Sequence, residues 1–163
     1  MVKRLLVACF VVLVSASSLK TQALSPIFLK DGYLQRDSSK PVHLLEYKDP
    51  YRFGIGEGFS LWLNFEVPAQ VQNLCTKRDV VQCELWVTLK AKAYRPGRTR
   101  TIENLRDASW EYAGNNFITE EQMNFNILGN VPGNTAAGNA TLSIKVNKNN
   151  INIFTLELPV VIN

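Results

Sequence analysis

The sequence predicts an all-β protein built as a two-sheet antiparallel β-sandwich. Three observations support this: apolar and polar residues alternate over several short segments, turn-forming residues separate the segments, and no convincing helical periodicity is present. Six or more short strands at this spacing are typical of a sandwich whose apolar faces turn inward. Residues 24–163, about 140 residues, suit one domain with a substantial core.

The N-terminal segment resembles a secretory signal peptide. Lys3 and Arg4 precede an uncharged run over 5–14, and small residues follow as far as Ser18. The apolar run is about half as long as a membrane-spanning helix requires. This pattern predicts a segment that is removed from the mature protein.

We expect a signal peptide over residues 1–18, with cleavage as late as residue 23, and a single β-sandwich domain over residues 24–163. The mature protein would be secreted, either to the extracellular space or to the endolysosomal lumen. The formal net charge is +4, and loss of the two basic residues near the start lowers it to +2. Much of the basic character therefore belongs to the signal, and binding of intracellular nucleic acid is not expected.

The first three predicted strands lie in the N-terminal half of the domain. They are Val42–Tyr47, then Phe59–Val67 with the clearest alternation, then Cys83–Ala93 with the same pattern. Trp62 and Trp86 interrupt the outward polarity of the second and third strands. We expect these indoles to pack on each other or under a loop, rather than to form a ligand platform.

Three more strands are predicted over Gln122–Leu128, Thr141–Val146 and Ile151–Ile162. A polar turn at Asn147–Asn150 joins the last two strands, which should form a hairpin. Pro159 indicates an edge or a bulge in the final strand because proline cannot donate a ladder hydrogen bond.

Turn-forming stretches separate these strands, and residues 101–110 are compatible with one short helix. The predicted turns are Asp31–Gly32, Asp49–Pro50, Gly54–Gly58, Arg95–Gly97, Gly114–Asn116 and Gly129–Gly138.

Two cysteines would remain after Cys9 leaves with the signal. In an oxidising compartment Cys75 and Cys83 should form a disulfide, which would stabilise the fold by about 2 to 3 kcal/mol in the chain-entropy model. Metal binding is the poorer alternative because His43, the only histidine, is not spaced with them as a zinc ligand would be. Asn139 begins the only N-x-S/T sequon and is the candidate for a surface glycan.

The sequence contains no recognisable catalytic apparatus. His43 is the only histidine that could serve as a base, and its place on a predicted strand favours a surface or structural role. Gly54–Gly58 leads into a strand rather than a helix N-terminus, so a turn is a better interpretation than a phosphate loop. We therefore expect no enzymatic activity, no cofactor and no metal site.

A run of basic residues is the most polarised feature of the mature chain. An anionic membrane surface or an acidic glycan would complement it, and a solvated loop accounts for it equally well. The run comprises Lys90, Lys92, Arg95, Arg98, Arg100 and Arg106.

The order of these features resembles the ML lipid-recognition family, which includes the Niemann-Pick type C soluble sterol carrier. Phe28–Gly32 resembles that family's opening F-x-D-C-G without its cysteine, and Gly58–Phe65 resembles its Φ-x-Φ-x-F strand. The closing hairpin of Leu142–Val146 and Phe154–Ile162 resembles the family's final strand, C-x-E-Φ-P-V-x-I. The family's disulfide framework is not reproduced. An unrelated immunoglobulin-like sandwich would show the same alternation, as would a lumenal sandwich of the seipin type.

The ML resemblance implies a secreted carrier that holds a sterol or acyl lipid between its two sheets. Each methylene buried from water would contribute about 0.8 kcal/mol. The implied lipid-binding residues are Phe59, Leu61, Leu63, Phe65, Leu85, Val87, Leu89, Phe125, Ile127, Ile144, Phe154 and Leu156. Each of them is equally compatible with an ordinary core position.

The alternative is a secreted immunoglobulin-like module that binds another secreted protein or a receptor through an exposed face. This hypothesis predicts a filled core and an apolar surface patch, whereas a lipid carrier predicts excess volume between the sheets. Exposure of Trp62, Trp86 or Trp110 would favour the interaction module.

Overall fold

The computed structural model describes residues 27–37, 39–46, 48–66, 83–118 and 123–163. These ranges form strands and one short 3-10 turn: β1 (Phe28–Arg36), β2 (Val42–His43), β3 (Tyr51–Phe53), β4 (Gly58–Glu66), β5 (Cys83–Tyr94), η2 (Ile102–Asn104), β6 (Leu105–Ile118), β7 (Asn124–Asn130), β8 (Gly138–Lys148) and β9 (Ile151–Ile162).

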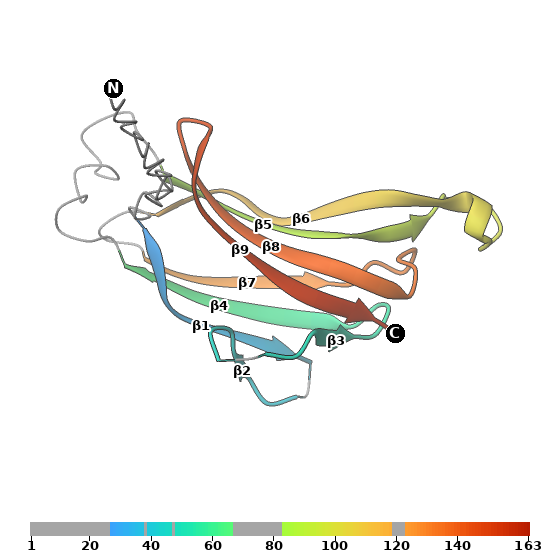
Figure 1. The fold of residues 1–163 in the computed structure, drawn as a ribbon, viewed down its shortest axis with the longest axis horizontal. Coiled ribbons are helices and arrows are strands. Elements are labelled where there is room, and N and C mark those ends of the chain that lie inside the picture. The colour runs from blue at the N-terminus through green and yellow to red at the C-terminus, as the bar shows by residue number, and fades with distance from the viewer. Residues whose placement is uncertain (1–26, 38, 47, 67–82, 119–122) are drawn as a thin grey trace, which may run out of the picture.

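The strands form two sheets that pack face to face, which confirms the predicted β-sandwich (Figure 1). The four-stranded sheet has the order β2-β1-β4-β7, and the five-stranded sheet has the order β3-β9-β8-β5-β6. One pairing departs from the antiparallel prediction, because β3 runs parallel to β9. β3 lies in the five-stranded sheet, whereas the strands before and after it in the chain, β2 and β4, belong to the four-stranded sheet.

The core lies between the sheets and consists of alternate residues from both. On β4 the side chains of Phe59, Leu61, Leu63 and Phe65 are buried, and the residues between them face outward. The inward side chains of all the longer strands join a single hydrophobic cluster. Because the period of a strand is two, this burial fixes which residues of each strand reach the outer face.

The predictions for β4, β5 and β9 agree closely with the structure, although Val67 lies outside the described residues. The predicted hairpin between β8 and β9 is also present. Asn149 and Asn150 have φ of 50° and 64°, as expected for a two-residue turn whose twist matches the strands. β3 pairs with β9 only from Val160 onward, so Pro159 occupies an edge position, as predicted.

Other strand boundaries were wrong. The predicted strand at 42–47 is reduced to Val42–His43, followed by a turn over 44–46. The strand predicted at 122–128 is shifted to β7, and the one predicted at 141–146 is longer in both directions in β8. Cross-strand pairing extends β8 through polar residues whose own pattern does not predict a strand.

Three strands were missed, namely β1, β3 and β6, and two predicted turns lie inside them. Asp31–Gly32 lies at a register shift in β1, and Gly114–Asn116 lies opposite a register shift in β5. Both are β-bulges, where glycine and small polar residues are accommodated without ending the strand. The predicted short helix at 101–110 is limited to the three residues of η2, and β6 occupies the remainder.

The β5–β6 hairpin extends beyond the rest of the sandwich at one end (Figure 1). β8 pairs with β5 only as far as Lys90, so the distal part of the hairpin is two-stranded. The loop over 131–137 braces it through the backbone hydrogen bonds Tyr94 N to Asn134 O, 2.9 Å, and Ala136 N to Lys92 O, 2.8 Å.

Candidate functional site

The structure brings the twelve predicted lipid-binding residues together between the two sheets. They come from β4, β5, β7, β8 and β9, and all belong to the core cluster or pack against it. Phe154 and Leu156 are partly buried, whereas the other ten are buried. The sequence pattern therefore identified the inward face of each of these strands correctly.

The centre of this interior is closely filled. A cavity wide enough for an acyl chain would leave accessible area on the side chains that line it. Leu61, Leu85 and Val87 each retain 0% of their accessible surface. A lipid would therefore enter this centre only if the sheets moved apart, and binding there stays a prediction.

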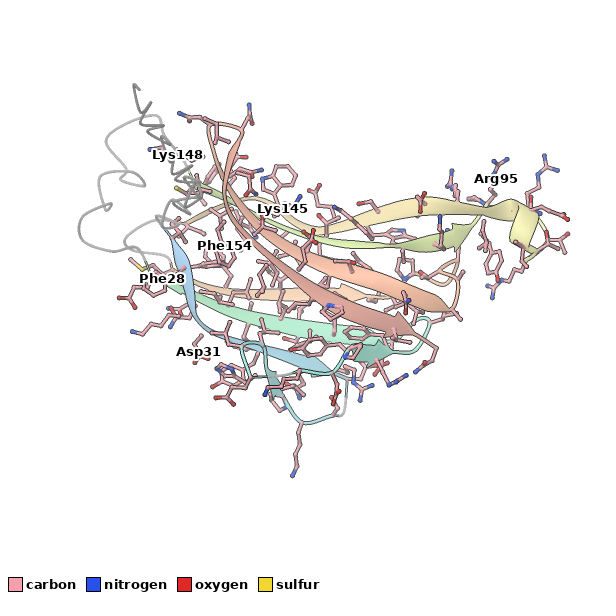
Figure 2. The ribbon with its side chains drawn as sticks, in the orientation of Figure 1. Phe28, Asp31, Arg95, Lys145, Lys148 and Phe154 are labelled. Atoms are coloured by element: carbon pink, nitrogen blue, oxygen red, sulfur yellow. The ribbon has the colours of Figure 1, made fainter. Side chains whose placement is uncertain are left out.

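One end of the interior is less tightly closed. Three aromatic rings meet there, with centroid distances of 6.1 Å from Phe65 to Phe125 and 5.8 Å from Phe65 to Phe154. Figure 2 shows Phe154 directed between the sheets at this end of the molecule. Of these three rings, only that of Phe154 is partly exposed.

The outer face of the four-stranded sheet has a different character from a solvated strand surface. Trp62 is 52% exposed at the middle of β4, and its direct cross-strand partner on β1 is Tyr33, which is also exposed. On β7 the cross-strand partner of Trp62 is Asn126. Leu128, two residues further along β7 and on the same face, is 71% exposed. We call this surface the Trp62 face; it comprises Asp31, Tyr33, His43, Ser60, Trp62, Asn64, Asn124, Asn126 and Leu128.

At one edge of the Trp62 face, three polar side chains are linked. His43 Nε2 lies 2.8 Å from Asp31 Oδ1, and the His43 ring meets the edge of Tyr33 at 5.0 Å between centroids. The negative charge of Asp31 and its hydrogen bond to the phenol raise the pKa of Tyr33 above its usual value. His43 thus contacts both Asp31 and Tyr33, and its predicted surface or structural role stays a prediction.

A shallow hollow of about 250 Å³ lies beside Trp62 on this face. Its walls include the aromatic side chains of Tyr33 and Trp62 and the polar side chains of Asp31, Asn64 and Asn124. Nearby, Ser60 Oγ donates a hydrogen bond to Asn126 Oδ1 at 2.9 Å. The surface thus combines two exposed rings with uncharged donors and acceptors, a composition suited to recognition rather than to acid–base chemistry.

The expectation that Trp62 and Trp86 pack on each other is wrong, because they lie on the outer faces of opposite sheets. Trp86 is half-buried, and its indole Nε1 donates to Glu84 Oε2 at 3.3 Å. Trp110 is also half-buried and packs against the core cluster. Of the three indoles, only that of Trp62 is exposed.

Sequence reasoning missed most of the Trp62 face. The exposed Trp62 was identified as an interruption of strand polarity, but Tyr33 was not placed beside it because β1 was not predicted. The local signal for that strand consisted of two aromatic–leucine pairs, Phe28–Leu29 and Tyr33–Leu34, with a charged pair and a glycine between them. The pairing with β4 supplies the remaining information.

Cys83 is fully buried at the start of β5, whereas its predicted partner Cys75 lies outside the described residues. The predicted signal peptide over 1–18 also lies outside the described residues. The disulfide and the signal peptide therefore both stay predictions. Asn139 is exposed as the second residue of β8 rather than in the loop before it, and its glycosylation stays a prediction.

Within the ranges that the structure describes, no three His, Cys, Asp or Glu side chains lie close enough to hold a metal ion. A search of the same ranges for a helix with the length and apolar character needed to span a membrane found none.

Comparison with known proteins gives no assignment. The chain matches no protein-family model, and no curated protein shows significant sequence similarity to it.

Proposed function

We propose that the protein is a secreted, non-enzymatic recognition module that binds a protein partner through the Trp62 face. The observation that carries the proposal is the exposure of Trp62, 52%, directly beside the exposed Tyr33 at the centre of a sheet face. Trp and Tyr are enriched at protein interfaces and among the residues that dominate binding energy.

The electrostatics of the face support a protein partner. Asp31 lies at the edge of the face in contact with His43 Nε2, and the residues around Trp62 on β4 and β7 are uncharged. Desolvating amides and hydroxyls costs little when a partner returns their hydrogen bonds, whereas desolvating an unpaired charge is expensive. An uncharged centre with rings and amides is therefore well suited to burial against another protein.

The filled interior also supports this function over that of a lipid carrier. A protein partner can bind the Trp62 face without any change in the core. A lipid between the sheets would first have to displace contacts among fully buried side chains such as Leu61 and Val87. The carrier interpretation that follows from the ML resemblance is therefore the competing outcome of the test.

The experiment begins with a photo-reactive amino acid placed at position 126, beside Trp62 on the same face of the secreted protein, and at position 86 in a matched control. Cross-linking is carried out in the producing culture, and the captured partner is identified, purified and mixed with the unmodified protein. The proposal expects one protein captured repeatedly from position 126 and not from position 86, with direct binding by the purified pair.

Native mass spectrometry of the same secreted protein tests the competing outcome. A sterol or acyl lipid that remains bound in the Trp62→Ala variant and is lost on solvent extraction would contradict the proposal and support the carrier. The mass of the free protein, together with partner binding that depends on Trp62, would support the recognition module.

A further inference from the structure

The distal part of the β5–β6 hairpin concentrates the positive charge of the chain. We call residues 90–107 the basic arm. It contains six basic and two acidic side chains, so its formal net charge of +4 equals that of the whole chain. Figure 2 shows Arg95 near the projecting end of this hairpin, on the opposite side of the molecule from Phe154.

Most of this charge is not neutralised within the arm. Lys92 Nζ lies 2.7 Å from Asp107 Oδ1, which accounts for one of the two acidic residues. Over the residues that the structure describes, Arg95, Arg98 and Arg106 form no ion pair with an acidic side chain, and all three are exposed. These guanidinium groups are available to an external anion.

The arm is held in position rather than free. Besides the backbone bonds to the 131–137 loop, Arg100 Nη2 donates to Gly133 O at 3.0 Å. The Arg100 guanidinium also lies 5.8 Å from the centre of the Tyr94 ring. A supported arm presents its charges with a smaller loss of conformational entropy on binding than a loose loop would.

An apolar side chain lies among these charges. Ile102 in η2 is 86% exposed, the highest exposure among the large hydrophobic side chains of the described residues. A purely polyanionic ligand such as an acidic glycan offers no apolar surface to bury the Ile102 side chain. A lipid bilayer offers both contacts, because its phosphates pair with arginine and its acyl boundary accepts the apolar side chain.

We propose that the basic arm docks on the surface of an anionic lipid membrane, with Ile102 inserted among the acyl chains and Arg95, Arg98 and Arg106 contacting lipid phosphates. This inference is independent of the Trp62 face, which belongs to the other sheet. Each arginine near such a surface raises membrane partitioning by about fivefold, and the attraction weakens as salt is added.

The test is co-sedimentation of the full secreted protein with vesicles of phosphatidylcholine alone and of phosphatidylcholine mixed with phosphatidylserine. We expect binding to the mixed vesicles, little binding to phosphatidylcholine, and release by salt. Replacing Arg95, Arg98 and Arg106 together with Gln should lower partitioning by about 100-fold and leaves the Arg100 contacts that brace the arm in place. The charge-matched control replaces the exposed Lys40, Lys48 and Arg52 with Gln and should have a much smaller effect.

Ile102→Asn separates a membrane from other polyanions. It should lower partitioning into the mixed vesicles by about tenfold and leave binding to heparin unchanged. Ile151→Asn is the matched control. Ile151 is 68% exposed at the first residue of β9, directly after the β8–β9 turn and outside the basic arm. Circular dichroism would check that each variant is folded.

Two results would overturn the proposal. The first is no binding to the mixed vesicles at low salt. The second is vesicle binding that Ile102→Asn leaves unchanged while heparin binds equally well, which would identify the arm as a site for soluble polyanions.

Discussion

Trp62 and Trp86 occupy equivalent places in their strands, yet their surroundings differ. Both face outward between two buried residues. Trp86 lies opposite the bulge of β6, where a Cβ on Gly114 would come within 3.0 Å of its Cζ3, and it donates to Glu84. Trp62 is paired with Tyr33 and Asn126 on the adjacent strands, and its ring stays 52% exposed.

This difference shows what decides the role of an outward aromatic residue. Alternation along one strand sets the face, but the neighbours on adjacent strands decide whether the ring is covered. Trp86 is covered by its own sheet and contributes to stability. Trp62 is not, and we propose that a partner covers it.

The largest expected effect comes from Leu61→Ala, the inward neighbour of Trp62. Leu61 is fully buried, so its truncation removes core contacts and should lower the free energy of unfolding by about 2–5 kcal/mol. Urea denaturation measures this. A loss below about 1 kcal/mol would show that the interior is looser than described and would reopen the interior as a ligand site.

Trp86→Ala should have the next largest effect on stability. The ring is half-buried and makes one side-chain hydrogen bond, so we expect a loss of about 2 kcal/mol, roughly half that for a fully buried aromatic. The same denaturation assay applies. Equal stabilities of the Trp86→Ala and Trp62→Ala variants would remove the basis of the comparison.

Tyr112→Phe tests an aromatic residue that links the two sheets. Its hydroxyl donates to Asn130 O at 2.6 Å, and its ring meets Phe59 edge-on, so loss of the hydroxyl should cost about 1 kcal/mol.

The Tyr112 substitution also has a pH signature. Burial raises the pKa of Tyr112 from 10.0 to about 12. The unfolded protein therefore loses this phenol proton at a lower pH than the folded protein does. The stabilisation that comes from keeping the phenol neutral is fully present below pH 10, the unfolded pKa, and is lost as the pH rises through the folded pKa of about 12. The wild type should therefore lose more stability than the variant when denaturation is repeated from pH 10 upward, whereas parallel pH curves would contradict the assignment. Tyr33, whose pKa is also raised, remains in both proteins.

Trp62→Ala should have the smallest effect on stability, within about 0.5 kcal/mol, because the ring is 52% exposed on the outer face of its sheet. Thermal unfolding would measure it. A loss comparable to that of Trp86→Ala would mean that Trp62 serves the fold rather than a partner.

The sequence predicted the sandwich and the inward faces well because burial imposes a period of two on the longest strands. β4, β5 and β9 could be recognised from that period alone. β6 could not, because it is an edge strand whose pattern is broken by the bulge at Gly114. β1 was hidden by the bulge at Asp31, where a charged residue and a glycine suggest a turn.

The candidate site was harder to predict than the fold. Its residues come from β1, β2, β4 and β7, so no single segment carries its signature. Trp62 was visible as an exception to alternation, but its pairing with Tyr33 depends on a register that only the assembled sheet specifies. The basic arm was visible in composition, whereas the exposure of Ile102 depends on the turn geometry of η2.

The most direct test of the central claim is the dissociation constant of the captured partner for the wild type, Trp62→Ala and Trp86→Ala. We predict that Trp62→Ala weakens binding by about 30-fold or more, as for an interface hot spot, while Trp86→Ala leaves it unchanged once folding is accounted for. Equal affinities for all three proteins would contradict the assignment of the Trp62 face as the binding surface.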